Sequence, residues 1–187
     1  MIIIKKVVTL DDINCVVALA DSIWRAHYTP IIGVVQVEYM LAKFQSAAAV
    51  TAQISEGYEY YLAEFDQQRV GYMAIRPLPD ESSLFLSKIY VDPSLSGKGV
   101  GCAMMKFCEN ICRSQGLDHI WLTVNKHNAS SIQWYAKRGF QRVGSIVQDI
   151  GGGFVMDDFK MAKQIVAELS DKERENPGEG CAGDTDN

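Results

Sequence analysis

Three glycines at alternate positions most constrain what this chain can fold into. Gly97, Gly99 and Gly101 lie in the stretch VDPSLSGKGVGCAMMKFCENIC, between an apolar run that ends at Asp92-Pro93 and a long amphipathic segment. Proline has no amide donor and a fixed φ, so it ends the preceding strand. The pattern therefore predicts a strand, a glycine-rich turn, and a helix that begins at that turn.

A turn of this kind is a predicted anion site. Unpaired backbone N–H groups point outward at the positive end of the helix dipole, and phosphate is the expected ligand. A P-loop needs Lys-Ser/Thr after its last glycine, and a dinucleotide fingerprint needs a third glycine where Cys102 stands. The spacing excludes both motifs. An ordinary strand-to-helix turn is the structural alternative.

The chain around this turn predicts strands and helices of one α/β domain. Helical periodicity and helix caps at Thr9 and Asn128 predict helices over 10–26, 37–44, 47–54, 100–111 and 129–138, and Pro30 is expected to stop or bend the chain after the first helix. Runs of β-forming residues predict strands over 2–8, 59–65, 69–75, 84–91, 119–124, 141–149 and 154–161.

Length and composition limit the organisation and the partners. The 187 residues are 48% hydrophobic, which suits one domain, predicted over 1–169, followed by a polar tail over 170–187 that we expect to be disordered. Five cysteines and three histidines without ligand spacing predict no metal site. A net charge of −5 argues against nucleic acid, and no long apolar run or signal peptide is visible, so we expect a cytoplasmic protein without a membrane partner.

Two motifs in sequence order resemble the GNAT family of acyl-CoA-dependent N-acetyltransferases. The family's loop, Gln/Arg-x-x-Gly-x-Gly/Ala, matches residues 96–101, although Ser96 replaces the long side chain usual at the first place. The later stretch NKHNASSIQWYAKRGF is similar to the family's second cofactor motif. The resemblance spans about 2–163, and the chain is loosely similar to bacterial polyamine-type members. It implies a GNAT fold: a mixed sheet of about seven strands, flanked by about four helices and splayed in the middle to hold acetyl-CoA.

The resemblance also implies a set of site residues. Tyr135 is the expected general acid, and a backbone N–H within Ile89, Tyr90 and Val91 is the expected oxyanion donor. The remaining cofactor-binding residues are expected to be Ser96, Gly97, Lys98, Gly99, Val100, Gly101, Cys102, Asn128 and Ser131. The predicted acceptor pocket contains Trp24, His27, Tyr28 and Glu64, and the general base is left open among Glu64, Asp80, Glu81 and Asp149.

The predicted function is transfer of an acetyl group from acetyl-CoA to a primary amine of a small molecule, polyamines included, or of a peptide. A non-catalytic acyl-CoA sensor or interaction module is the alternative, because the strand over 84–91 carries no carboxylate. A homodimer is left open. Tyr135 has a second interpretation as a packed aromatic, and Asn128 as only a helix cap.

Overall fold

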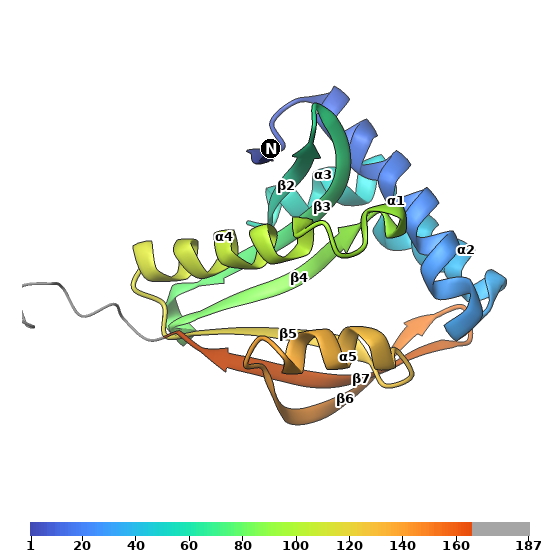
Figure 1. Cartoon of the computed structure of the whole chain (residues 1–187). Coiled ribbons are helices and arrows are strands. Elements are labelled where there is room, and N and C mark those ends of the chain that lie inside the picture. The colour runs from blue at the N-terminus through green and yellow to red at the C-terminus, as the bar shows by residue number, and fades with distance from the viewer. Residues whose placement is uncertain (166–187) are drawn as a thin grey trace, which may run out of the picture.

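The fold is a seven-stranded sheet with helices on both faces (Figure 1). The computed structural model describes residues 1–165, so the predicted boundary between 169 and 170 and the predicted tail lie outside it. The strands are β1 Ile2–Lys6, β2 Glu59–Phe65, β3 Gln68–Leu78, β4 Ser83–Val91, β5 His119–Asn125, β6 Gln141–Gly151 and β7 Phe154–Gln164. The helices are α1 Leu10–Ile32, α2 Val34–Phe44, α3 Ala47–Ser55, α4 Val100–Ser114 and α5 Ala129–Ala136, with 3-10 turns at Pro79–Glu81 and Pro93–Leu95.

The sheet splits between its two central parallel strands. The strand order is β1-β2-β3-β4-β5-β7-β6, and the ladders other than β4–β5 are antiparallel. Strands β4 and β5 pair only from Ser83 and His119 to Phe85 and Trp121. Beyond this point they diverge, as Figure 1 shows. The predicted mixed and splayed sheet is confirmed, and the opening lies at the carboxyl ends of both strands, where α/β sheets bind ligands.

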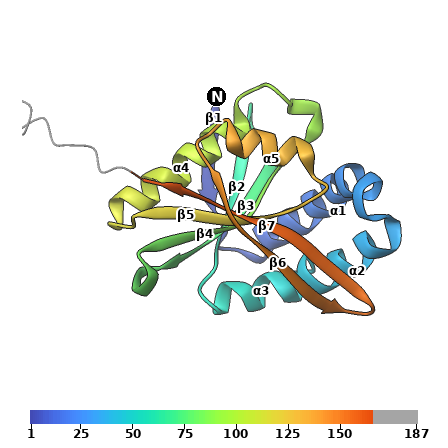
Figure 2. The same ribbon diagram turned by 90° about the horizontal axis from the view of Figure 1, so that it is seen from below.

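Two cores hold the halves together on opposite faces of the sheet. Helices α4 and α5 cover one face and α1–α3 the other (Figure 2). The first core joins α4 to β3, β4 and β5 through buried residues such as Met73, Leu84, Met104, Cys108 and Ile120. The second joins α1–α3 to β2 and β3 through Val16, Trp24, Val37, Tyr60 and Tyr72. Each predicted helix buries its apolar stripe, as amphipathic helices do.

One helix prediction needs correction. The periodicity predicts that the first helix ends near residue 26, but α1 continues to Ile32; the five helices of the described residues match the five predicted ranges. Pro30 lies inside the last turn, where it removes one backbone hydrogen bond, and Gly33 ends the helix with φ 82°. No helix within residues 1–165 has both the length and the apolar character to span a membrane.

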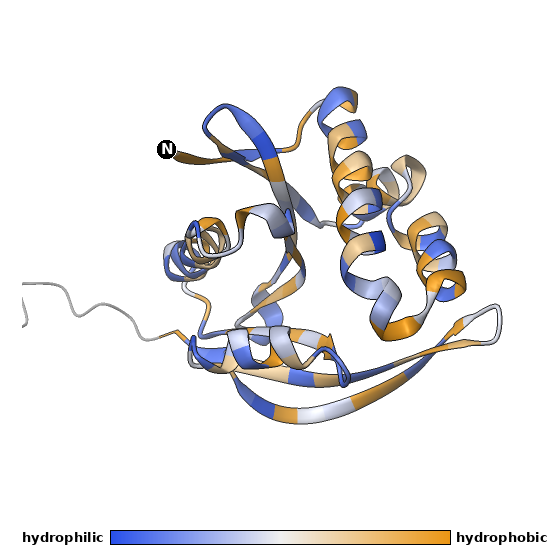
Figure 3. Ribbon diagram, turned by 45° about the vertical axis from the view of Figure 1, so that its right-hand side comes forward, coloured by the Kyte–Doolittle hydropathy of each residue, from blue (hydrophilic) through white to orange (hydrophobic). Residues whose placement is uncertain are grey.

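The β6–β7 hairpin reaches across the opening to α2. The Tyr39 hydroxyl donates to the carbonyl of Ile150 at 2.7 Å, and Gln36 Nε2 donates to the carbonyl of Val155 at 3.2 Å. Figures 1 and 2 both show the hairpin tip beside α2. The outer strand β6 is otherwise exposed, and Figure 3 shows hydrophobic bands alternating with hydrophilic ones along it. The hairpin thus closes one side of the space between the two halves of the sheet.

Candidate active site

A cavity of about 630 Å³ fills the opening between β4 and β5. Residues of α1, α2, α3, α5, both central strands and the β6–β7 hairpin line it. Nine of the predicted site residues are among them: Trp24, His27, Tyr28, Ile89, Tyr90, Val91, Asn128, Ser131 and Tyr135. The structure therefore brings together segments that are more than 100 residues apart in the sequence.

Aromatic rings form the wall that α1 contributes. The ring of Tyr28 lies 4.7 Å from that of Trp24 and 6.1 Å from that of Tyr90, centroid to centroid. Trp24 is buried and its Nε1 donates to the hydroxyl of Tyr72 at 3.2 Å. Trp24 is therefore both a core residue and a cavity residue, and the two interpretations of this position hold together.

Tyr135 enters the cavity from α5. Its side chain is 9% exposed and packs edge-on against Trp134 and Phe140. Burial is the main cause that raises the Tyr135 pKa, and nearby Tyr28 adds to it. The phenol is therefore protonated throughout the ordinary pH range, which keeps it a hydrogen-bond donor. Its hydroxyl makes no hydrogen bond with another residue in 1–165.

Asn128 uses one end of its side chain and leaves the other free. Its Oδ1 caps α5 by accepting from the amide of Ser131 at 3.3 Å and from the hydroxyl of Ser130 at 3.2 Å. Its Nδ2 is buried and has no partner within hydrogen-bond distance in the described part of the chain, although the Asn128 side chain lies near enough to the Tyr28 hydroxyl to oppose the rise in the pKa of that tyrosine. Buried donors are nearly always paired, so this amide suits a ligand carbonyl at the cavity wall. The cap role is confirmed, and the cofactor role remains a prediction.

The start of α4 carries no side-chain cap. Thr9, Ser46 and Asn128 cap α1, α3 and α5, whereas α4 begins after Gly99 with no such hydrogen bond. The first amides of a helix have no partner inside it, so those of residues 100–102 are available to an anion. Gly97 has φ 78° and Gly99 has φ 83°, a region that other residues rarely adopt. Ser96 and Lys98, on the same turn, are exposed.

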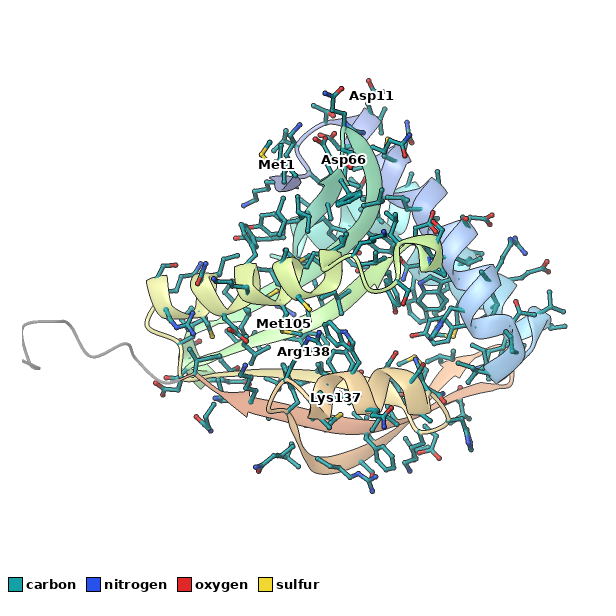
Figure 4. The ribbon with its side chains drawn as sticks, viewed as in Figure 1. Met1, Asp11, Asp66, Met105, Lys137 and Arg138 are labelled. Carbon is teal, nitrogen blue, oxygen red and sulfur yellow. The ribbon has the colours of Figure 1, made fainter. Side chains whose placement is uncertain are left out.

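Gly101 has a structural use that the sequence did not reveal. A Cβ built on it would lie 3.1 Å from Trp134 Cζ2, so its bareness lets α4 and α5 approach each other. The Arg138 guanidinium stacks 3.7 Å above the Trp134 ring, and its Nη2 lies 2.7 Å from Cys102 Sγ. Figure 4 shows Arg138 and Met105 between the two helices. Arg138 was not among the predicted site residues, although it lies in the second motif one helical turn after Trp134.

Glu64 does not belong to the cavity, which corrects its prediction as a pocket residue. It lies on β2, where Lys5 Nζ is 2.7 Å from its Oε2 and Arg69 Nε is 4.0 Å from its Oε1. The other base candidates are also outside the cavity lining. Asp80 and Glu81 are exposed on the turn before β4, and Asp149 accepts from the amide of Gly151. Side-chain spacing along the chain gave no means of separating these acids.

Asp158 is the carboxylate that the structure places in the cavity wall. It lies on β7 opposite Asn125 and is 6% exposed. Burial is the main cause that raises its pKa, while a hydrogen bond with Thr123 opposes the rise. An acid in such an environment can hold an ammonium group or take its proton. Nothing in the sequence separates Asp158 from its neighbour Asp157, and their strand β7 lies next to the edge strand β6.

The described cysteines and histidines form no ligand cluster. Cys15, Cys102, Cys108 and Cys112 are free thiols, and no three His, Cys, Asp or Glu side chains within residues 1–165 gather as a metal would require. Cys181 lies outside the described residues. The absence of a metal remains a prediction from the sequence.

The glycine turn, the paired motif on α5 and the split sheet together point to one family. Residues 19–140 match the acetyltransferase (GNAT) family. The chain belongs to this family. An uncharacterized N-acetyltransferase of Mycobacterium tuberculosis is 32% identical over 105 residues, which are 56% of this chain and 65% of the relative. The match thus spans less than two thirds of that relative's length.

Two matches in Thermoplasma acidophilum, one of sequence and one of structure, extend the comparison to the whole fold. The spermidine N(1)-acetyltransferase is 21% identical over 155 residues, covering 80% of this chain and 92% of that protein. The crystal structure of the PaiA N-acetyltransferase in complex with coenzyme A superposes with a TM-score of 0.71 at 22% identity, covering 88% of this chain and 99% of the other. The predicted GNAT fold is confirmed.

Proposed function

We propose that this protein transfers the acetyl group of acetyl-CoA to a primary amine of a small molecule or peptide. One observation carries the proposal: a single cavity at the split of the sheet is lined from one side by Asn128 and Tyr135, and from the other by the aromatic side chains of α1. Such a space can hold a thioester and an acceptor together, so that transfer is direct. Bringing both reactants into one site supplies much of the rate gain.

The cofactor is held by backbone and side-chain donors of the second half of the chain. The uncapped amides at the start of α4 bind the pyrophosphate, and Arg138 adds a positive charge beside Cys102. Asn128 Nδ2, which is buried without a partner among the described residues, donates to the pantetheine arm. Beyond Phe85 the β5-facing backbone groups of β4 have no strand partner, which leaves an amide near Ile89 free to act as oxyanion donor.

The proposed reaction moves one proton from the acceptor and gives one to sulfur. The neutral amine attacks the thioester carbon, a C–N bond forms, and the C–S bond breaks after a tetrahedral intermediate. Asp158 takes the proton that the amine loses, and Tyr135 donates a proton to the departing sulfur. After transfer Asp158 carries the proton lost by the amine and Tyr135 is deprotonated. Proton exchange through solvent returns both groups to their starting states, and the raised pKa of Tyr135 favours its return to the protonated form.

Thiol release from acetyl-CoA across a panel of amines tests this proposal. Tyr135→Phe should lower kcat about 100-fold or more, because general acid catalysis contributes that range, while cofactor affinity changes little since the ring still packs. Tyr61→Phe is the matched control. That tyrosine is similarly buried, but its hydroxyl bonds Glu59 and it does not line the cavity. A kcat within about threefold of wild type in Tyr135→Phe would assign the proton to another group.

The same assay separates the enzyme from the non-catalytic alternative. A sensor would bind acetyl-CoA, detectable by calorimetry, and release no thiol above the uncatalysed rate with any amine. The proposal predicts release with at least one acceptor. A homodimer and the peptide class of acceptor remain open predictions.

A further inference from the structure

Lys88 is a buried cation in the wall of the cavity, beside α3. It lies on β4 and is 8% exposed. The β3–β4 ladder pairs Ala74 with Lys88 and Ile75 with Leu86, so Ser87 is an extra residue without a partner. Such a bulge changes which face the following side chains point to. Leu86 packs in the core under α4, whereas Lys88 reaches the rings and helix on the α3 side.

The ammonium group of Lys88 has neutral neighbours only. Its Nζ donates to Gln53 Oε1 at 2.6 Å and lies 3.5 Å from Ser87 Oγ. The rings of Tyr58 and Tyr60 are 5.8 and 5.2 Å away. No carboxylate of residues 1–165 lies within 4.0 Å of Nζ. A buried charge without a counter-ion is costly, so a position that packing alone shaped would favour an apolar residue.

The partner of Lys88 is held in place by two other hydrogen bonds. Gln53 Nε2 donates to the carbonyl of Phe44 at 3.1 Å, and the Tyr60 hydroxyl donates to Gln53 Oε1 at 2.7 Å. These bonds orient the amide, so its oxygen fixes the ammonium at the cavity wall. An ammonium has three donors, and at least one remains for a bound group. Burial lowers the Lys88 pKa to about 8, so near neutral pH the group is mainly charged.

The charged residues in the cavity wall fit an acceptor that carries a negative group at one end and a positive group at the other. Lys88 and Asp158 are the only Lys, Arg, Asp or Glu residues among the described ones that line the cavity, and they form no ion pair with each other. Much of the remaining wall is aromatic, with Trp24, Phe85 and Trp121 among the rings. A polyamine would bring a second positive charge to a wall with a single acid and a buried ammonium.

We propose that Lys88 binds a carboxylate of the acceptor, so that the substrate is a primary amine that also carries a carboxylate and an apolar body, as amino acids do. This rests on the proposed function, because it assigns the acceptor of the same reaction. Asp158 then faces the amino end, and Lys88 the acid end. The recognition is specific because removal of the carboxylate leaves the ammonium buried and unpaired.

Acceptor pairs that differ only by a carboxylate test the assignment: tryptophan with tryptamine, phenylalanine with phenethylamine, and lysine with cadaverine. In wild type, kcat/KM should favour the acid of at least one pair about 10- to 100-fold, the range of a hydrogen bond to a charged group. Lys88→Met should bring this ratio near one by raising KM for the acid. Lys88→Arg should restore part of it, and Lys106→Met, on the exposed face of α4, should leave it unchanged.

Three outcomes overturn the proposal. The first is a wild-type kcat/KM that favours the acid in none of the pairs. The second is an equal fall of kcat for both members of a pair in Lys88→Met, which would make Lys88 a proton acceptor. The third comes from binding. Calorimetry with 3-phenylpropionate, a carboxylate that has no amine to acetylate, keeps the test independent of catalysis. Binding that weakens about 10-fold or more in Lys88→Met supports the anion site even if no amine is acetylated, whereas equal binding to both proteins refutes it.

Discussion

Replacing Lys88 with methionine should stabilise the free protein at neutral pH, and the gain should fade as the pH rises. Burial lowers the pKa of this lysine from its ordinary value of 10.5 to about 8. Keeping the proton during folding at pH 7 therefore costs up to ~3 kcal/mol. Methionine is of similar length and uncharged. The substitution leaves no orphan acceptor either, because the Tyr60 hydroxyl still donates to Gln53 Oε1.

The sign is set by proton binding. Between about pH 8 and pH 10.5 the unfolded chain holds more protons at residue 88 than the folded one, so wild-type stability rises across this window relative to the variant. Urea unfolding of wild type and Lys88→Met at several pH values from about 7 to about 10 measures the difference between their free energies of unfolding. The contributions of the other titrating groups cancel in this difference. The difference in free energy of unfolding between the two proteins should shrink by ~2 to 3 kcal/mol over this range. If the difference in free energy of unfolding between Lys88→Met and wild type stays constant to within ~0.5 kcal/mol across this range, Lys88 does not carry an uncompensated buried charge.

Two glycines give further predictions. Gly101→Val should weaken coenzyme A binding at least ~10-fold in calorimetry, because the valine side chain would push Trp134 away from the start of α4. Gly144→Val, on the open surface of β6, is the control. Equal affinities of Gly101→Val and wild type for coenzyme A would contradict the argument. Gly152→Ala should lower the free energy of unfolding by ~1–3 kcal/mol, since φ is 63° and the new Cβ would meet Tyr39 at 2.8 Å. Gly153→Ala, with φ 79° and nothing within 4 Å, isolates the strain, and an equal loss there would exclude the contact.

Local signals in the sequence were sufficient for most of the fold. Thr9 and Asn128 mark helix starts that the structure confirms through their side-chain caps. The glycines after Pro93 mark the bare helix start, since positive φ at Gly97 and Gly99 is a local backbone requirement. The end of α1 was not readable, because a proline in the final helical turn removes little and packing against the sheet decides whether the helix continues.

The chemistry of the cavity depended on register, which the sequence hides. The extra residue Ser87 directs Lys88 toward α3, and nothing in the residues LFLSKIYV marks a bulge. Asp158 reaches the wall because β7 pairs with β5 in a register that places it opposite Asn125. Glu64 was misplaced for the same reason, as its strand β2 is two strands away from the opening. Long-range strand pairing determines whether each of these three charged side chains reaches the cavity, and residue spacing along the chain does not reveal that pairing.

The contact between α2 and the β6–β7 hairpin also limits the shape of acceptor that the proposed reaction can use. Strand β4, helices α1 and α2, the hairpin tip and strand β5 form a continuous loop of chain around the cavity, joined by the Tyr39 and Gln36 hydrogen bonds. Under the proposed function, a cavity enclosed in this way favours acceptors that are narrow, such as a free metabolite or the end of a polypeptide, over a lysine on the flat surface of a folded protein.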